Sequence, residues 1–240
     1  MTLHQTRSQR LHEDLRKIIA STNPGERLLS EPALAQRLGV SRATLREAMR
    51  TFETQGLIHR RQGSGTYVIH PTQVIQTGLE VLESIETLAK RIGLPVSMGE
   101  LKVEHRPARD EEVEFLCQEK LCQVVQLSRV ILAEGRPVAY LIDILPEDIL
   151  PPQDIETGFT GSVLDLLLER GSLPLATSRT EINAVTATHD VARSLGIQRG
   201  DVLLRFVACL YTATNRIVDY SFSYFLPGYF KFHIIRRVGK

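Results

Sequence analysis

Apolar residues near the N-terminus recur with helical spacing in three consecutive segments. The first segment predicts a helix over residues 8–21, and the second begins at Ser30, which is suited to cap a helix that ends at Gly39. Ser41 is placed to cap a third helix only two residues later. The buried stripe of this helix has spacing i, i+3, i+4, i+7 and consists of Leu45, Ala48, Met49 and Phe52. A helix ended by glycine and followed at once by a second capped helix is typical of a helix-turn-helix.

A glycine-rich hairpin is predicted directly after the third helix. Residues 57–61 and 66–69 favour two short strands, and Gln62-Gly63-Ser64-Gly65 lies between them as the turn. Arg42, Arg46 and Arg50 repeat every four residues on a second face of the preceding helix. Arginines on a helix are often only solvated, and an ordinary helical unit is the alternative interpretation. The capped helix, the tight turn and the basic hairpin together favour a DNA-binding winged helix-turn-helix.

The rest of the chain alternates between strand and helix patterns. After residues 70–73, which read as a linker, a helical pattern covers Ile75 to Ile92. Candidate strands are 101–105, 124–133, 137–145, 178–185, 202–212 and 217–226, and candidate helices are 110–116, 162–169 and 188–195. Turn residues at 134–136 and 213–216 join neighbouring strands as hairpins. Hairpin-joined strands with few crossover helices predict an antiparallel sheet and an α+β fold.

Composition narrows the class of protein. The 240 residues are 42% hydrophobic and 24% charged, and no apolar run approaches the ~20 residues of a membrane helix. No signal-peptide pattern opens the chain, so we expect a cytoplasmic protein that does not associate with membranes. Three cysteines argue against a disulfide framework. Cys117 and Cys122 have no second pair and no histidine beside them, so we predict no metal site and no cofactor.

Charge is distributed unevenly between the two halves. Residues 1–70 carry 11 Lys and Arg against 6 Asp and Glu, whereas residues 71–240 carry 18 against 22. A basic first half that coincides with the helix-turn-helix pattern indicates a nucleic-acid reader followed by a separate acidic module.

Motifs along the first half resemble the GntR family of bacterial transcription factors, and in particular its HutC-type subfamily. The resemblance covers residues 7–68 and rests on the runs Pro24-Gly25-Glu26-Arg27-Leu28, Leu38-Gly39-Val40-Ser41-Arg42, Leu45-Arg46-Glu47-Ala48-Met49, Gly56-Leu57-Ile58 and Gln62-Gly63-Ser64-Gly65-Thr66-Tyr67-Val68.

The second half, over about residues 85–232, resembles the UTRA ligand-binding domain of the same regulators. The matching pieces include Gln126-Leu127-Ser128-Arg129, Glu134-Gly135-Arg136-Pro137-Val138-Ala139 and Ile217-Val218-Asp219-Tyr220-Ser221-Phe222. The resemblance implies a chorismate lyase-like antiparallel fold that binds an effector and forms the dimer. We therefore expect a winged helix-turn-helix domain over 1–70, a linker over 71–84 and a UTRA domain over 85–240.

A recognition helix presents its N-terminal residues to the base edges in the major groove. The predicted DNA-contacting residues are Ser41, Arg42, Thr44 and Arg46 on this helix and Gln62, Gly63 and Gly65 in the wing. Ser41 also suits a cap, and the two glycines also suit a tight turn. Many family members carry an arginine soon after the Ser-Glu at positions 30–31, whereas this chain has Pro32 there, preceded by Leu29. That DNA contact is therefore missing.

Effector-binding residues are carried over from the resemblance to the UTRA domain. They are Arg129, Ser162, Arg179, Glu181, Asp219 and Tyr224. Arg129 interrupts an apolar strand and is suited to an anion, with an internal ion pair to Asp219 or Glu181 as the alternative. A helix cap is an equal alternative for Ser162, and a surface ion pair is the favoured alternative for Arg179 with Glu181.

The sequence predicts a ligand-responsive transcriptional regulator rather than an enzyme. We expect a homodimeric repressor that binds a palindromic double-stranded operator and is released by a small polar or anionic effector, such as a phosphorylated or carboxylated metabolite. A module whose chief partner is another protein and a lyase-like enzyme are the alternatives. The runs that mark common hydrolases, zinc proteases and nucleotide-binding enzymes do not occur in the sequence.

Overall fold

The computed structural model describes residues 6–23, 25–54, 57–61, 64–68, 74–117, 122–159 and 161–236. The chain divides into two compact units, Met1–Val74 with Leu226–Tyr229 and Ile75–Phe225 with Phe230–Lys240.

The first unit is a three-helix domain with a two-stranded hairpin. Its elements are α1 (Arg7–Ala20), α2 (Glu31–Leu38), α3 (Arg42–Thr54), β1 (Ile58–Arg61) and β2 (Gly65–Val68). The predicted helical stripes meet in one core, in which Leu15, Leu34, Leu45, Met49 and Phe52 are at most 1% exposed. Gly39 ends α2 in the left-handed region, at φ 63°, which turns the chain directly into α3.

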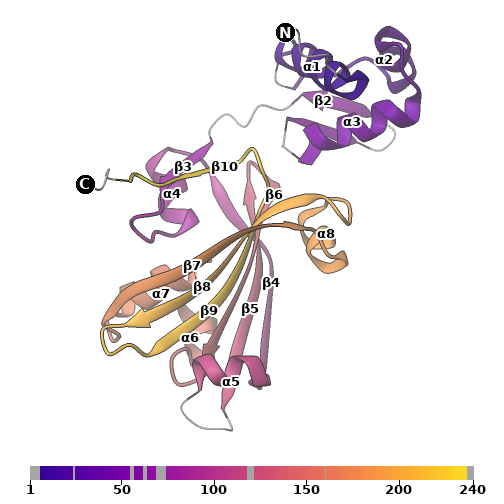
Figure 1. The fold of residues 1–240 in the computed structure, drawn as a ribbon. Helices are drawn as coiled ribbons and strands as arrows, with labels where there is room; N and C mark the ends of the chain where they lie inside the picture. Colours follow the sequence, from indigo (N-terminus) through magenta and orange to yellow (C-terminus); the bar gives the residue numbers. More distant parts are fainter. Residues whose placement is uncertain are drawn as a thin grey trace. The chain divides into compact units, whose positions relative to one another are not determined.

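The second unit is built on a six-stranded antiparallel sheet in the order β4-β5-β6-β9-β8-β7 (Figure 1). The strands are β4 (Val96–Pro107), β5 (Gln123–Ala133), β6 (Arg136–Pro146), β7 (Leu175–Thr186), β8 (Val202–Thr212) and β9 (Ile217–Phe225). Hairpins join β5 to β6 and β8 to β9, as the turn residues predict. The α+β fold with an antiparallel second domain is therefore confirmed.

Short helices and a small second sheet accompany the large one. The helices are α4 (Ile85–Arg91), α5 (Asp110–Leu116), α6 (Pro152–Gly158), α7 (Val163–Arg170) and α8 (His189–Leu195). One hydrophobic cluster contains α7 residues packed with Leu127 and Leu145, and another contains Leu116 of α5 packed with Val124 and Ile144. Successive side chains of a strand point to opposite faces, and the first cluster uses odd-numbered positions of β5 and β6 whereas the second uses even-numbered ones. The helices α7 and α5 therefore cover opposite faces of the sheet.

The segment that enters the second unit differs from its prediction. Residues 75–92 were expected to be one helix, but Ile75–Gly78 forms strand β3 and only Ile85–Arg91 is helical. Strand β3 pairs in parallel with β10 (Phe230–His233), and Figure 1 shows α4 beside this pair. The helical pattern is wrong here because a pairing over 150 residues away in sequence determines the local structure. Part of the predicted linker is thus a strand of the second unit.

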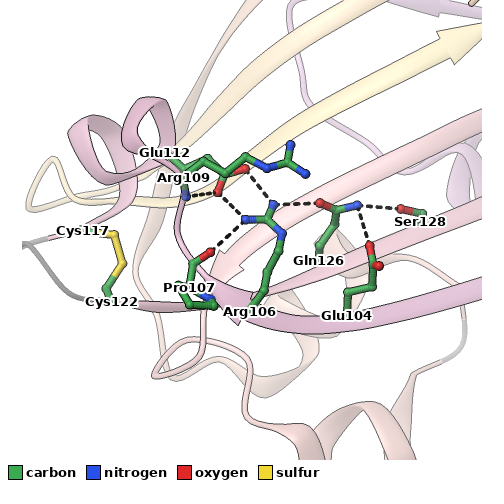
Figure 2. A network of polar contacts seen from close by, with 9 residues as sticks. All are labelled: Glu104, Arg106, Pro107, Arg109, Glu112, Cys117, Cys122, Gln126 and Ser128. Atoms are coloured by element: carbon green, nitrogen blue, oxygen red, sulfur yellow. Dashed lines mark hydrogen bonds and ion pairs between the residues drawn. A yellow bond between two sulfur atoms is a disulfide. The ribbon is translucent and has the colours of Figure 1, made fainter.

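A disulfide joins Cys117 and Cys122 at the end of α5, with 5.9 Å between their Cα atoms. The sequence argued against a disulfide framework and did not predict this single local bridge, because an odd number of cysteines does not exclude one. In Figure 2, the neighbouring Arg106 binds both carboxylate oxygens of Glu112, at 2.6 and 2.7 Å, and Gln126 at 2.8 Å. Burial of Glu112 alone would raise its carboxyl pKa, but the bonds from Arg106 and Arg109 hold that pKa below its ordinary value. The bridge and this ion pair together fix α5 to the sheet.

None of the described helices is long and apolar enough to cross a membrane. Within the described ranges, no group of His, Cys, Asp and Glu side chains is arranged to hold a metal ion.

Candidate nucleic-acid interface and ligand cavity

The N-terminal turn of α3 carries the predicted DNA-reading residues on an exposed surface. The Thr44 backbone N–H donates to Ser41 Oγ at 3.1 Å, so Ser41 caps α3, and the two hydroxyl oxygens lie 2.8 Å apart. Arg42 is exposed beside them. This turn therefore offers a guanidinium and two hydroxyl groups at the end of a helix, where the helix dipole also favours an anionic partner.

Arg46 is engaged within the protein. Its Nε lies 2.7 Å from Glu31 Oε2, although the arginine side chain remains 55% exposed. Glu31 also lies 3.9 Å from Arg60 Nη1 on β1, and Arg60 donates to the Arg46 carbonyl at 3.3 Å. One carboxylate of α2 therefore links the recognition helix to the first strand of the wing. Sequence reasoning did not identify Glu31 or Arg60, since their pairing depends on the packed domain.

The wing hairpin pairs β1 with β2 from Ile58↔Val68 to Arg61↔Gly65. Gly65 has φ 126°, and a Cβ at this position would meet the guanidinium of Arg27. The backbone conformation disfavours a side chain here, and Arg27 would have to move to accommodate one. Gln62 and Gly63, the other predicted wing contacts, lie outside the described residues. Arg27 is a basic residue beside the wing that the sequence analysis did not single out.

Arg50 contributes to the same helix in a different way. It lies 3.8 Å from Glu47, one turn earlier, as an i, i+3 ion pair. Arg50, the third arginine of the periodic set on α3, is therefore held in an ion pair within its own helix.

A cavity of about 750 Å³ lies in the second unit, on the face of the large sheet that packs against α7. Its walls come from five of the six strands, from the segment over residues 77–88, from α7 and from β10. The polar lining includes Arg129, Asp143, Ser162, Asp219 and Glu86. The volume and the mixed polar and apolar lining are those of a small-molecule site.

Arg129 and Asp143 form a buried ion pair at the centre of this lining. The Nη1 of Arg129 donates to Asp143 Oδ2, and the side chains are 5% and 12% exposed. The arginine also lies over the Phe159 ring, 5.7 Å from its centroid. An internal pair was the alternative for Arg129, and its partner is Asp143 rather than Asp219 or Glu181. A lone aspartate in the apolar run 141–145, opposite a lone arginine in a neighbouring apolar strand, is the signal that would have found it.

Asp219 lies next to this pair. Burial raises the pKa of the Asp219 carboxyl well above its ordinary value, nearby Asp143 raises it further, and Arg129 opposes both. Burial likewise raises the pKa of Glu86. Ser162 also lines the cavity, but its Oγ accepts from the Asp165 N–H at 3.0 Å, so the cap interpretation holds as well.

Three predicted effector residues lie away from the cavity. Thr180 and Ile182 of β7 line it, so the alternating neighbours Arg179 and Glu181 point to the other face, where they form an exposed pair at 3.1 Å. Tyr224 lies an odd number of residues from Asp219, with the opposite orientation, and its ring stacks with Tyr140 at 6.3 Å. Arg179, Glu181 and Tyr224, which the sequence predicted as effector-binding residues, therefore do not line this cavity.

The same two regions match known families. Residues 7–68 match the bacterial regulatory proteins of the gntR family, and residues 92–231 match the UTRA domain. The protein belongs to the GntR family of regulators that carry a UTRA domain. The family is confirmed as the sequence motifs indicated, and the protein is a DNA-binding transcriptional regulator with a ligand-binding domain, not an enzyme.

Relatives of known description agree with this assignment. The chain is 25% identical over 217 residues to the HTH-type transcriptional repressor NagR of Bacillus subtilis, covering 90% of this chain and 88% of the relative. It is also 25% identical over 237 residues to the mannosyl-D-glycerate transport/metabolism system repressor MngR of Escherichia coli, covering 97% and 96%. The crystal structure of PhnF from Mycobacterium smegmatis has the same fold, with a TM-score of 0.65, 20% identity and coverage of 95% and 100%.

Proposed function

We propose that this protein is a cytoplasmic, homodimeric repressor of the HutC type that leaves a palindromic operator when a small polar or anionic metabolite binds the second domain. The observation that carries the proposal is the combination of an exposed, arginine-bearing α3 N-terminus with a separate polar cavity of about 750 Å³. The first feature suits a DNA duplex, and the second suits a small molecule.

Reading of the operator is assigned to the first turns of α3 and to the wing. Arg42 has the exposure required for two hydrogen bonds to a guanine, and Ser41 and Thr44 are placed for phosphates. Arg46 reaches a base only by leaving Glu31, so it is the weaker reader of the two. The wing residues Gln62, Gly63 and Gly65 complete the proposed interface.

Dimerisation is assigned to the second domain, which was expected over residues 85–240 and to which strand β3 at Ile75–Gly78 also belongs. Strand β7 has only β8 as a neighbour in the sheet, and most of its 12 residues are exposed. An exposed edge strand of this length is a surface that a second copy can cover. Two linked readers then bind two half-sites, which multiplies the affinity without new contacts.

Release follows if the effector binds more tightly to a dimer whose recognition helices no longer match successive grooves. A ligand shifts the equilibrium only by its difference in affinity for the two states. The cavity walls include β7, the proposed dimer contact, so a ligand in the cavity can change the position of this strand and with it the arrangement of the dimer.

The experiment is a fluorescence anisotropy titration of the full chain against DNA from upstream of its own gene. Arg42→Ala should weaken operator binding by about 1–3 kcal/mol per reader and relax the preference at one base pair. Arg16→Ala is the matched control, because it removes one exposed arginine from α1. Equal losses on operator and random DNA would make Arg42 a phosphate contact. Equal affinity for a half-site and a full site would refute the dimer.

A further inference from the structure

The cavity of the second unit has an excess of acidic groups. Among the described residues that line it, five are carboxylates and Arg129 is the only cation. Two of the carboxylates bind elsewhere: Glu83 pairs with Arg91, and Glu80 accepts the Ile235 N–H. Glu86, Asp143 and Asp219 remain around the single guanidinium.

The positive charge of Arg129 is already neutralised. Asp143 holds its Nη1 in an ion pair that is almost fully buried. A phosphate or carboxylate that entered would compete with Asp143 and would lie beside Asp219 and Glu86. Removing an anion from water into such surroundings is unfavourable, because no unpaired cation compensates for its lost hydration.

Acceptor atoms in the same lining are unused. Asp219 is 7% exposed, and its Oδ1 has no hydrogen-bond partner in the described part of the chain. The acceptor Glu86 Oε1 and the donor Arg129 Nε also lack a hydrogen-bond partner among the described residues. Buried polar atoms are usually hydrogen-bonded in folded proteins, so acceptors in a cavity wall that lack a protein partner are suited to a bound molecule or water. The molecule that fits must donate hydrogen bonds to carboxyl groups.

Three aromatic rings belong to the same cavity lining. Phe206, Phe225 and Phe232 line the cavity, and their ring centroids lie 4.6 to 5.0 Å from one another. The C–H faces of a sugar or polyol pack against such rings while its hydroxyl groups point to polar partners. The same rings offer nothing to an anion.

On the basis of the proposed function, we infer that the effector is a polyhydroxylated compound, such as a sugar or an amino sugar, that carries no phosphate or carboxylate. Asp219 and Glu86 accept its hydroxyl or amino hydrogens, while Arg129 stays paired with Asp143.

The test is a calorimetric titration of the full-length protein with matched probes. These are glucose, glucosamine, N-acetylglucosamine and maltose, together with glucose 6-phosphate, glucosamine 6-phosphate, N-acetylglucosamine 6-phosphate and glucuronate. We expect saturable binding by at least one uncharged or amino probe and none by its charged counterpart. Binding of a phosphorylated or carboxylated probe in preference to its parent would overturn the inference, as would binding by none of the uncharged and amino probes.

Variants of the lining separate this site from other surfaces. Asp219→Leu keeps the side-chain size but removes the acceptor, and it should lower the affinity for the probe by about tenfold or more. Glu181→Leu removes a carboxylate from the opposite face of β7 and should leave binding unchanged. Inorganic phosphate should not bind the unmodified protein but should bind Asp143→Asn, in which Arg129 is released. Phosphate binding by the unmodified protein would instead assign an anion site to Arg129.

Operator release keeps the two proposals distinguishable. If a sugar phosphate releases the operator, the proposed repressor function stands and only the effector class is wrong. If an uncharged sugar binds the cavity through Asp219 but leaves operator affinity unchanged, the effector class stands and the proposed release is wrong.

Discussion

Replacing Glu31 by glutamine should increase the affinity of the protein for its operator. Glu31 Oε2 holds Arg46 Nε at 2.7 Å, so Arg46 must give up this ion pair before it reaches the DNA. The carboxylate also brings a negative charge close to the phosphates. Glutamine keeps the size and can accept one hydrogen bond, but it removes the charge.

The expected size of the effect follows from the exposure of the pair. The Arg46 side chain is 55% exposed and Glu31 is 21% exposed, so the pair belongs with surface ion pairs of about 0.2–1 kcal/mol. Two readers in a dimer double this value, to about 0.4–2 kcal/mol, or roughly a two- to thirtyfold gain in operator affinity. The gain should shrink at high salt, because exposed charges are screened.

Anisotropy titrations of the full chain at two salt concentrations measure this difference. Glu47→Gln is the control, because it removes one unit of negative charge from α3 but its partner is Arg50 rather than Arg46. A thermal melt accompanies each variant, since Glu31 lies in the first turn of α2 and also approaches Arg60. An unchanged or lower affinity for Glu31→Gln with an unaltered melting temperature would refute the idea that Glu31 restrains Arg46.

Three further predictions concern stability. Replacing Cys117 and Cys122 together by serine should lower the unfolding free energy by about 2 kcal/mol, because the bridge restricts the short loop in the unfolded chain. The difference should vanish when the unchanged protein and the variant are both measured in a reductant. Asp219→Asn should gain unfolding free energy relative to the unchanged protein as the pH rises above about 4. The reason is that the raised pKa of folded Asp219 makes the native protein bind more protons than the unfolded chain, so the unchanged protein loses stability as the pH rises. Denaturant titrations of both proteins across about pH 4–8 measure the difference, and a difference that does not vary with pH would contradict the argument. Gly65→Ala should destabilise the first domain by about 1–3 kcal/mol, because φ 126° is an unfavourable backbone conformation for alanine. An unchanged melting curve of the full chain would contradict this strain.

The helices and strands of this protein were largely predictable where local signals determine them. The boundary at Gly39, the cap at Ser41 and the strand over residues 202–212 follow from residue type and periodicity, and the structure places all three as expected. Strand β3 was missed because its partner β10 lies at the other end of the chain, where no local pattern points to it.

The sequence identified some residues of the ligand cavity but not their partners, because the partners depend on how the strands are paired. Arg129 was identified as a charge within an apolar strand and Asp219 through the resemblance to the UTRA domain, and both line the cavity. Tyr224 was also taken from the resemblance, but alternation of side chains along β9 places it on the other face of the sheet. The partner Asp143 required the register between β5 and β6, which pairs it opposite Leu127, one step from Arg129.

The parallel pairing of β3 with β10 also bears on how the protein is made. The first residues of the second domain, Ile75–Gly78, cannot complete their small sheet until Phe230–His233 has left the ribosome. The winged-helix domain has no such requirement within its own three helices and hairpin, and it can fold while the second domain is still being synthesised. During translation, a nascent chain therefore carries a finished DNA reader before the wall of its ligand cavity, which includes Phe230 and Phe232, exists.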